Sequence, residues 1–487
     1  MTYQTIFAKS FSRHDQKRLG CGAFVGCLVI ALSFCAVFKP YLSPLPVCKS
    51  ETVEFAVVIG LWTLQNVIKY GEINQPKANR IVMAFRSSSS TDIKSKEVKP
   101  ICDISQQRSD VCELNGDIRI SINSSTIFLA STQMSILKET NNNSWTIRPY
   151  ARKGDETAMA GVTKFKIKME EAHSISQADP RCNRTHNVTG IVFSTGGYLG
   201  NLFHDFFDVL IPLYLTAREF DGQVQFLVAN KKSWWLIKHR ALIQKLSRYD
   251  IIDMDKDDGA GHCFSRLIVG LKHHKELSID PSKSPYSMKQ FTHFIRSSYS
   301  LKREKVIKLL RDDNNSTRRP RLLIVSRKRT RCFMNEGEIV KMSKRLGFDV
   351  TVTEANSNLS WFAQLVNSCD VMMGVHGAGI TNMVFLPENA VLIQVLPLGV
   401  MEWLARTSFE EPAKDMNLRY LEYKVSEEES SLIQQYPIDH EVIKNPQSIS
   451  KQGWVAFRSI YLDKQNVKLD VNRLRATLLE AQKLLQM

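Results

Sequence analysis

Residues 374–382 (GVHGAGITN) combine small residues with a histidine, in a pattern suited to binding a phosphate group. His376 can donate a hydrogen bond to developing negative charge, and Thr381 can hydrogen-bond a phosphate oxygen. The spacing is G-x-x-G-x-G, so it is not the G-x-G-x-x-G dinucleotide fingerprint. The alternative is a tight structural turn around a satisfied histidine. The small residues that let the backbone approach a pyrophosphate are Gly377, Ala378 and Gly379.

A second basic segment, residues 326–331 (SRKRTR), directly follows the apolar run RLLIV. Arg327 and Arg331 would lie at the carboxyl end of a strand, where a guanidinium can hold two phosphate oxygens at once. Such a clamp would offset the charge of a phosphate leaving group. A solvated basic loop is the alternative.

A third segment, residues 194–217, passes from a glycine-rich loop into an apolar helix that Asn201 opens. His204, Asp205 and Asp208 share the polar face of that helix. An attacking sugar hydroxyl must lose its proton, so a transferase needs a positioned base. His204 or Asp205 suits that role, with Asp208 orienting the base or contacting the acceptor. The alternative is a helix-capping pair without catalysis.

The sequence predicts no obligatory cofactor and leaves dependence on a divalent metal open. Asp253 and Asp255 have the D-x-D spacing with which some sugar transferases hold a divalent ion. This spacing is common by chance, so we interpret it as structural. No C-x-x-C or H-x-x-x-H spacing indicates a zinc site.

Apolar strands that alternate with helices must position these segments. The pattern is clearest in the last third, where helix 336–346 is capped by Asn335 and ends at Gly347. A parallel sheet covered on both faces follows from this alternation, and two such units make a two-domain α/β enzyme. The expected strands are 117–122, 125–129, 191–193, 223–228, 321–326, 348–353, 371–374 and 390–395, and the other expected helices are 202–217, 236–246, 359–367 and 381–385.

The N-terminal part contains an uncharged apolar run, residues 20–38, long enough to span a bilayer as a helix. Basic residues precede it, which keeps residues 1–19 cytosolic and places the rest in the lumen. Residues 39–100 resemble a flexible stem, except for the apolar run 55–64, which is too short to span a bilayer. We therefore expect an uncleaved anchor rather than a signal peptide.

A secretory route is also indicated by the cysteines and the N-x-S/T sequons. Seven of the ten cysteines follow the anchor, and an oxidising lumen would pair most of them. Cys102 and Cys112 are the expected local pair. The sequons lie at Asn123, Asn142, Asn183, Asn187, Asn314, Asn315 and Asn358.

The formal net charge of +16 raises the question of nucleic-acid binding. The lumenal compartment argues against it, and the basic residues are scattered rather than interleaved with aromatics. Contact with a diphosphate donor or an acidic polysaccharide, or simple solubility, accounts for the charge.

Taken together, several long segments in the same order resemble plant glycosyltransferase family 61, which contains xylan arabinosyl- and xylosyltransferases. The resemblance runs from about residue 101 to the C-terminus. The segments are CDISQQRSDVCELNGDIRI, GGYLGNLFHDFFDVLIPLY, CFSRLIVGL, RLLIVSRKRTR and VHGAGITNMVFLPENAVLIQVLP.

This resemblance implies a single-pass type II Golgi enzyme with two Rossmann-like domains in the GT-B arrangement, at 101–300 on the acceptor side and 301–487 for the donor. It implies an inverting transfer from a UDP-sugar, with the acceptor and base near His204 and Asp205. The donor would lie near Arg327, Arg331, His376, Gly377, Ala378, Gly379 and Asn382.

The expected function is transfer of arabinofuranose or xylose from a UDP-sugar to xylan or its side chains. The partners would be the UDP-sugar, the glycan acceptor, the Golgi membrane and other Golgi glycosyltransferases. Two alternatives stay open: a xylosyl- or N-acetylglucosaminyltransferase acting on protein-linked glycans, and a non-catalytic Golgi scaffold or glycan-binding protein.

Overall fold

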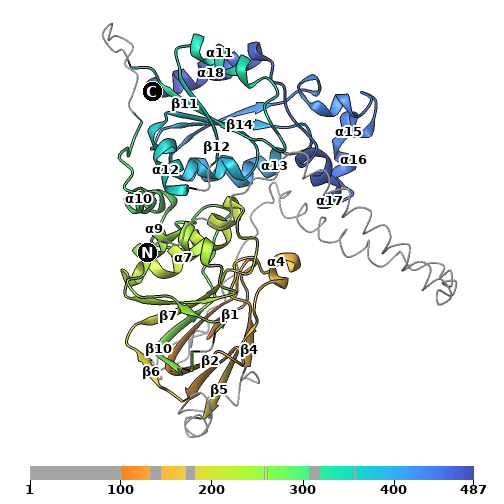
Figure 1. The fold of residues 1–487 in the computed structure, drawn as a ribbon. Coiled ribbons are helices and arrows are strands. Elements are labelled where there is room, and N and C mark those ends of the chain that lie inside the picture. The colour runs from red at the N-terminus through yellow and green to blue at the C-terminus, as the bar shows by residue number, and fades with distance from the viewer. Residues whose placement is uncertain are drawn as a thin grey trace, which may run out of the picture. The chain divides into compact units, whose positions relative to one another are not determined.

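Two β-sheets organise the described part of the chain in a computed structural model (Figure 1). The predicted cytosolic tail, anchor and stem lie outside that part. None of the helices in the described ranges is long and apolar enough to cross a membrane. The described residues are 101–131, 144–171, 181–256, 258–259, 261–306, 318–355 and 358–487.

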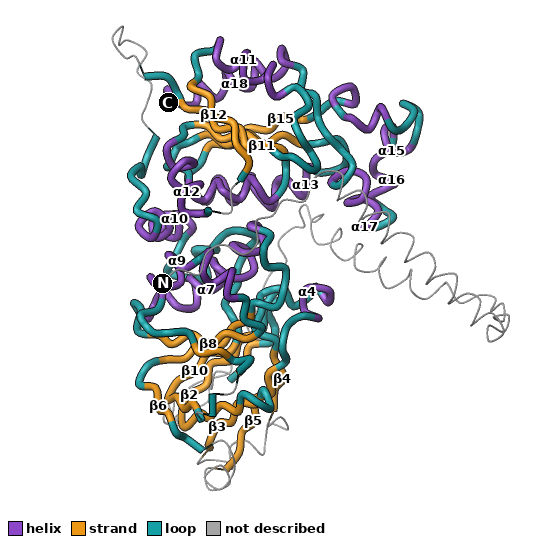
Figure 2. Tube along the Cα trace, in the orientation of Figure 1, coloured by secondary structure: helices purple, strands orange, loops and turns teal. Residues whose placement is uncertain are grey.

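The C-terminal sheet is parallel throughout, with strand order β12-β11-β13-β14-β15. Helices α11 (Glu336–Arg345) and α18 (Val471–Gln486) cover one face, and α12 (Leu359–Ser368) covers the other (Figures 1 and 2). The predicted parallel α/β unit is therefore confirmed. Its strands are β11 (Arg321–Ser326), β12 (Asp349–Glu354), β13 (Val371–Val375), β14 (Val391–Leu396) and β15 (Arg419–Lys424).

The strand β11 shows why both faces of this sheet must be covered. Successive side chains on a strand point to opposite faces. Leu322 and Ile324 pack in one apolar cluster with Leu474 of α18, whereas Leu323 and Val325 pack in another with Phe362 of α12. A strand that is apolar at every position is stable only between two helical layers.

The N-terminal sheet has ten strands and is mixed. The main path is β4-β5-β3-β2-β10-β7-β8-β9, and β1 and β6 pair with β2 and β10. Its strands are β1 (Cys102–Asp103), β2 (Val111–Ser121), β3 (Thr126–Ser131), β4 (Ser144–Ile147), β5 (Phe165–Glu171), β6 (Arg184–His186), β7 (Thr189–Ser194), β8 (Val224–Ala229), β9 (Ile252–Asp253) and β10 (His262–Val269).

The expected Rossmann-like unit is only part of this sheet. Strands β7, β8 and β9 are parallel and joined by helices, but β2 pairs with β10 in the antiparallel sense and carries β3 with it. The α/β class is therefore confirmed, while the expected second Rossmann-like sheet is corrected to a mixed sheet. The reason is that β10 has two neighbours: it pairs with β7 in the parallel sense on one edge and with β2 in the antiparallel sense on the other. Antiparallel strands therefore continue the sheet beyond its parallel part.

The two helices predicted for the N-terminal half both form, and the second is broken. The predicted helix 202–217 forms as α6 (Leu202–His204), the π-helix η2 (Asp205–Leu210) and α7 (Ile211–Ala217). The predicted helix 236–246 is instead split into α8 (Ser233–Lys238) and α9 (Arg240–Leu246). The break lies at His239, which is buried and hydrogen-bonded to Asp205.

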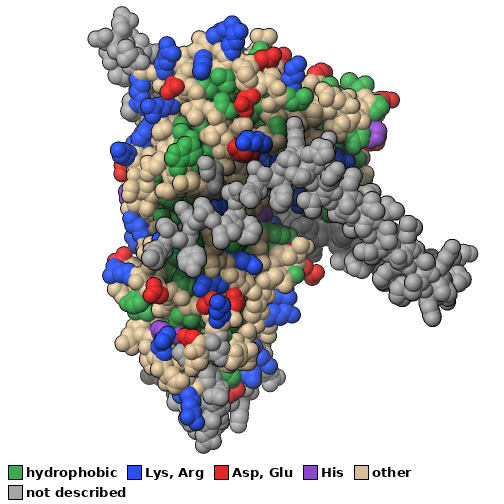
Figure 3. Space-filling model, viewed as in Figure 1, with side chains coloured by type: hydrophobic (Ala, Val, Ile, Leu, Met, Phe, Trp, Pro, Cys, Tyr) green, Lys and Arg blue, Asp and Glu red, His purple; other side chains and the backbone are tan. Residues whose placement is uncertain are grey.

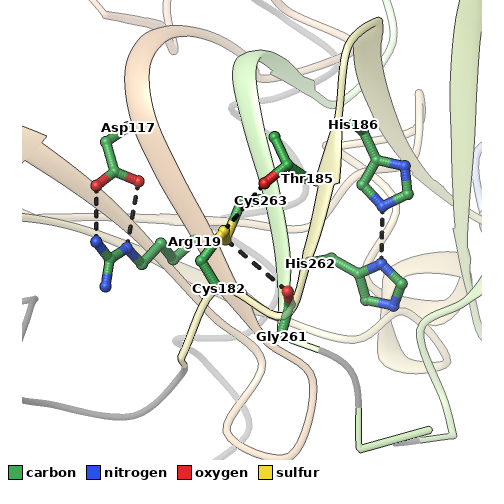
Figure 4. Close-up of a disulfide and its surroundings, with 8 residues drawn as sticks. All are labelled: Asp117, Arg119, Cys182, Thr185, His186, Gly261, His262 and Cys263. Atoms are coloured by element: carbon green, nitrogen blue, oxygen red, sulfur yellow. Dashed lines mark hydrogen bonds and ion pairs between the residues drawn. A yellow bond between two sulfur atoms is a disulfide. The ribbon is translucent and has the colours of Figure 1, made fainter.

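Two disulfides tie the N-terminal sheet together. The expected pair Cys102 and Cys112 links β1 to β2 where the two residues are register partners. A second bond joins Cys182 to Cys263, 81 residues apart in the chain. Figure 4 shows this second disulfide beside the hydrogen-bonded ring nitrogens of His186 and His262, which lie 2.9 Å apart.

One apolar cluster contains residues of both sheets, and residues Lys96–Met487 form one compact unit. Phe206 and Phe385 pack with ring centroids 6.0 Å apart, and Arg296 of α10 (Met288–Ser298) donates to Glu388 at 3.4 Å. The division at residue 300 stays a prediction. The other helices are α4 (Glu156–Ala160), η3 (Arg218–Phe220), η4 (Ala378–Phe385), α13 (Glu402–Ala405), η5 (Arg406–Glu410), α14 (Glu411–Asp415), η6 (Glu427–Glu429), η7 (Ser431–Gln434), α15 (Glu441–Lys444), α16 (Pro446–Ser450), α17 (Trp454–Phe457) and η8 (Arg458–Leu462).

Candidate functional site

Two arginines follow β11 and reach the loop that follows β13. Arg327 Nε donates to the carbonyl of Thr330 at 2.8 Å, which curls the loop back on itself. Arg331 has φ 56°, and its backbone N–H donates to Gln465 at 2.7 Å. The Arg331 guanidinium then donates through Nη1 to the carbonyl of His376 at 2.7 Å. The two predicted phosphate-binding segments therefore meet.

Gly377 lies directly beneath both guanidinium groups. Its φ is 144°, a conformation that only glycine adopts readily. A Cβ atom there would lie 2.7 Å from Arg331 Nη1 and 3.1 Å from Arg327 Nη1. Because β11 and β13 are parallel neighbours, this meeting point is at the carboxyl ends of both strands. In a sheet of order 2-1-3-4-5 it is the switch point, where ligands of open α/β sheets bind.

The electrostatics at this point favour an anion. Within the described ranges, no carboxylate forms an ion pair with Arg327 or Arg331. Burial, followed by the charge of the neighbouring Arg327, lowers the pKa of Arg331 to about 10. Both side chains stay protonated at neutral pH. Two partly desolvated positive charges without a carboxylate partner would bind a diphosphate more strongly than exposed arginines.

His376 is held as a neutral hydrogen-bond donor. Burial, followed by the charges of Arg331 and Arg327, lowers its pKa to about 3. Gln394 Nε2 lies 2.7 Å from His376 Nδ1, and Gln394 Oε1 accepts from the Tyr420 hydroxyl at 2.9 Å. Since the amide donates to Nδ1, this network assigns the proton to Nε2. Neither Gln394 nor Tyr420 was predicted, and no spacing in the sequence indicates them.

The small-residue loop continues into a 3₁₀-helix rather than the helix expected from residue 381. The helix η4 begins at Ala378, three residues earlier. Asn382 Nδ2 donates to the carbonyl of Gly379 at 2.9 Å, which holds its first turn. Thr381 Oγ1 and Asn382 Oδ1 are buried and have no hydrogen-bond partner within the described ranges. Both residues are thus close to Gly377 in sequence but enclosed by protein.

The second half of the site is on α6 and η2. Asn201 caps α6 by accepting from the Phe203 N–H at 3.0 Å. His204 Nδ1 lies 3.0 Å from Asp208 Oδ2, and the His204 side chain is partly exposed. A histidine whose Nδ1–H donates to a carboxylate keeps Nε2 as a proton acceptor. The π-helix begins one residue later, and such turns recur at functional sites.

Two residues that no sequence pattern indicated, Tyr150 and Arg152, hold Asp208 in place. The Tyr150 hydroxyl donates to Asp208 Oδ2 at 2.8 Å, and Arg152 Nη1 donates to Asp208 Oδ1 at 3.2 Å. Burial and the charge of Asp208 hold the pKa of the Tyr150 hydroxyl well above its usual value. Asp208 is therefore held from both sides, and its Oδ2 atom orients the His204 ring. Tyr150 and Arg152 lie more than 50 residues upstream, so helix periodicity could not have found them.

Asp205 has a different environment from the one expected of a base. Its carboxylate is fully buried and accepts from Trp235 Nε1 at 2.9 Å and Lys238 Nζ at 2.7 Å. Burial alone would raise its pKa, but the hydrogen bond from His239 and the charge of Lys238 outweigh burial and lower it to about 2. A carboxylate with every oxygen occupied is a poor proton acceptor. These contacts favour His204 over Asp205 as the base.

Aromatic contacts bring the two halves of the site together. Phe409 lies 5.8 Å from the Phe203 ring and 5.4 Å from the His376 ring, measured between centroids. Helix α6 also packs against η4. The turn that carries His204 is therefore next to the loop that carries Gly377.

Asp253 and Asp255 of the D-x-D segment form hydrogen bonds that stabilise a turn. Asp255 accepts from the backbone N–H groups of Asn230 at 2.7 Å and Lys231 at 2.6 Å. Asp253 accepts from Lys231 Nζ at 3.0 Å. Both carboxylates thus hold the turn after β8. Among the described residues, no group of three or more His, Cys, Asp or Glu side chains could hold a metal ion.

The predicted glycosylation sites fall partly within the described ranges. Asn123, Asn183, Asn187 and Asn358 are exposed there, and Asn358 also caps α12 by accepting from the Trp361 N–H. Figure 3 shows Lys and Arg side chains spread over the visible face among Asp and Glu rather than gathered in one stripe. The remaining predicted sites, Asn142, Asn314 and Asn315, lie outside the described residues.

Comparison with known proteins shows related sequences in plants. The family model described as Glycosyltransferase 61 matches residues 199–393, which include His204, both arginines and the GVHGAG loop. An alpha-1,3-arabinosyltransferase of Oryza sativa subsp. japonica, XAT3, is 48% identical over 79% of this chain, but the match spans only 65% of that protein. The beta-1,2-xylosyltransferase XYXT1 of the same species is 42% identical, over 79% of this chain and 84% of its own. The xylan glycosyltransferase MUCI21 of Arabidopsis thaliana is 34% identical, over 92% of this chain and 89% of its own length.

Proposed function

Since the chain belongs to glycosyltransferase family 61, we propose that it is an inverting pentosyltransferase. It moves arabinofuranose or xylose from a UDP-sugar to xylan or a xylan side chain. The observation that carries this proposal is the pair of partly buried guanidiniums, with no carboxylate ion-paired to them within the described ranges, over Gly377 at the carboxyl ends of β11 and β13. Relatives named as arabinosyl- and xylosyltransferases support the choice of a pentose.

The proposed transfer needs one base and stabilisation of the leaving group. His204 Nε2 accepts the proton of the acceptor hydroxyl while that oxygen bonds to the anomeric carbon of the donor. The bond from this carbon to the diphosphate oxygen breaks, the configuration inverts, and UDP leaves with the negative charge. Arg327, Arg331 and the Nε2–H of His376 offset that charge. Asp208 holds His204 in the required tautomer.

The cellular setting is part of the same proposal. Residues 20–38 would anchor the chain in the Golgi membrane as a single-pass type II protein, with the two sheets in the lumen in a GT-B arrangement. The two disulfides agree with an oxidising compartment. A fluorescence protease-protection assay tests this orientation, because a C-terminal tag must be protected and an N-terminal tag digested.

The enzymatic test uses the full-length chain in microsomes of a secretory host. It is offered labelled UDP-arabinofuranose, UDP-xylose and UDP-N-acetylglucosamine with xylan oligosaccharides. Arg331→Ala and His204→Ala should each abolish most transfer. Arg329→Ala is the matched control, since it removes an exposed arginine from the same loop.

Each outcome distinguishes between the candidate functions. Pentose transfer to xylan that survives in Arg331→Ala would refute the site. Transfer to protein-linked glycans alone would support the other transferase, and a wild type inactive with every donor would favour a scaffold. Full activity in chelator would show that Asp253 and Asp255 hold no catalytic metal.

A further inference from the structure

Helix α8 carries two adjacent tryptophans with opposite exposure. Trp235 is fully buried, whereas Trp234 is 51% exposed and Ile237, three residues further along the same face, is 70% exposed. The proposed chemistry uses neither exposed side chain. Because they are three residues apart on α8, Trp234 and Ile237 expose two apolar side chains on one face of this helix.

Asp205 holds helix α8, which carries Trp234, in place. This buried carboxylate accepts from Trp235 Nε1, from Lys238 Nζ and from the backbone N–H of Gly200, the last at 2.9 Å. It therefore fastens α8 to the glycine-rich loop that leads into His204. The N–H of Lys232, just before α8, is also held by Thr195 Oγ1 at 3.0 Å.

Gly200 is shaped to fit under the exposed indole. Its φ is +100°, and a Cβ atom there would lie 3.3 Å from Cη2 of Trp234. A side chain at this position would be both strained and in close contact with the ring. The indole thus rests on bare backbone one residue before the Asn201 cap of α6.

A rigid, exposed indole suits the flat face of a sugar ring. The face of the indole is electron-rich, and it attracts the positively polarised C–H groups that line one side of a pyranose. Holding the ring in advance reduces the entropy lost on binding. An aromatic surface of this kind binds glycan chains without needing charged groups.

We propose that Trp234 is a binding platform for the acceptor, contacting a sugar residue of the glycan chain next to the one that reacts. This inference rests on the proposed function. The acceptor rather than the donor is indicated, because Trp234 belongs to the His204 half of the site, whereas both phosphate-binding arginines follow β11 of the other sheet. Ile237 extends the same apolar surface for a further sugar residue.

The test compares acceptors of two lengths, xylobiose and xylohexaose, using the full-length protein. Trp234→Ala should raise KM for xylohexaose about tenfold while leaving kcat and the KM for UDP-sugar unchanged. The effect on xylobiose should be much smaller, and Trp234→Phe should retain most of the binding. Trp361→Ala is the matched control, because Trp361 is 49% exposed on α12.

Binding is also measured without transfer, by affinity electrophoresis in gels that contain xylan. Retardation of the wild type that is lost in Trp234→Ala but not in Trp361→Ala would support the platform, even if no sugar were transferred. Equal KM for xylohexaose in Trp234→Ala and wild type, with transfer intact, would overturn the platform and leave the proposed function standing. A change in oligomeric state with unchanged xylan binding would identify a protein contact instead and also overturn it.

Discussion

The substitution Gly377→Ala tests the donor site through a single methyl group. The added Cβ would lie 2.7 Å from Arg331 Nη1, closer than van der Waals contact allows, so the guanidinium must move. The Arg331 hydrogen bond to the His376 carbonyl is then lost or bent. The φ of 144° adds backbone strain of about 1–3 kcal/mol, which should lower the melting temperature.

The expected effect on transfer follows from the contact that is disturbed. A hydrogen bond to a charged group contributes about 1.5–3 kcal/mol, and the partly buried Arg331 has no carboxylate ion-paired to it within the described ranges to hold it elsewhere. A loss of about 3 kcal/mol corresponds to roughly a 100-fold fall in kcat/KM. Gly337→Ala on α11 is the control, since a Cβ there would meet no atom within 4 Å. We expect that variant to stay within about threefold of wild type.

A double-mutant cycle separates this mechanism from general damage. Initial rates at varied UDP-sugar are measured for Gly377→Ala, Arg331→Ala and the double variant. If the methyl group acts by displacing the guanidinium, it should cost little once Arg331 is gone. Additive losses in the double variant, or a Gly377→Ala protein with normal kcat/KM, would refute the reasoning.

Three further substitutions probe the rest of the molecule. His204→Ala should lower kcat by about 100-fold or more with little change in the KM for UDP-sugar, as steady-state kinetics would show; an unchanged kcat would exclude His204 as the base. Asp205→Asn should destabilise the fold by about 3 kcal/mol in a urea titration, because the fully buried carboxylate is lost and the partly buried Lys238 loses its ion-pair partner. The Asp205 pKa of about 2 lies below the unfolded value, so its stabilisation is complete above about pH 4 and is lost as the pH falls toward 2; a wild type and Asp205→Asn with the same acid transition would contradict this. Cys182→Ser should cost about 4 kcal/mol by freeing an 81-residue loop, whereas the free thiol variant Cys332→Ser should change the urea midpoint little; equal midpoints in both would argue against the bond.

The different fates of the two aspartates explain how one helix serves both structure and chemistry. Asp205 points to α8 and anchors the loop beneath Trp234, whereas Asp208 points to Tyr150 and Arg152 and orients His204. The π-helix begins at Asp205, directly after His204, and its wider turn increases the spacing between side chains there. Residues three apart in the chain thus face different environments.

Much of the secondary structure of the C-terminal half was predictable because it follows from the apolar pattern within each short segment. Strand β11 has the predicted bounds, and β12, β13, β14 and α12 differ from the predicted ranges by one residue at one or both ends. Strand β15 and helix α18 were not predicted. A run such as RLLIVS, apolar at every position, has few stable alternatives to a strand covered on both faces. Parallel order then brings loops after neighbouring strands to one edge, so the meeting of Arg331 with Gly377 could be expected.

The tertiary structure alone decided which polar groups pair. The sequence could nominate His204 and Asp205 by their spacing, but the pKa of Asp205 depends on Lys238 and His239, and the orientation of His204 depends on Tyr150 and Arg152. Likewise, β2 joins β10 from a distant part of the chain, and this pairing made the N-terminal sheet mixed. The periodicity of apolar residues indicates which face of a segment is buried. Hydrogen-bond partners, in contrast, come from segments far apart in the chain, and no local sequence pattern links them.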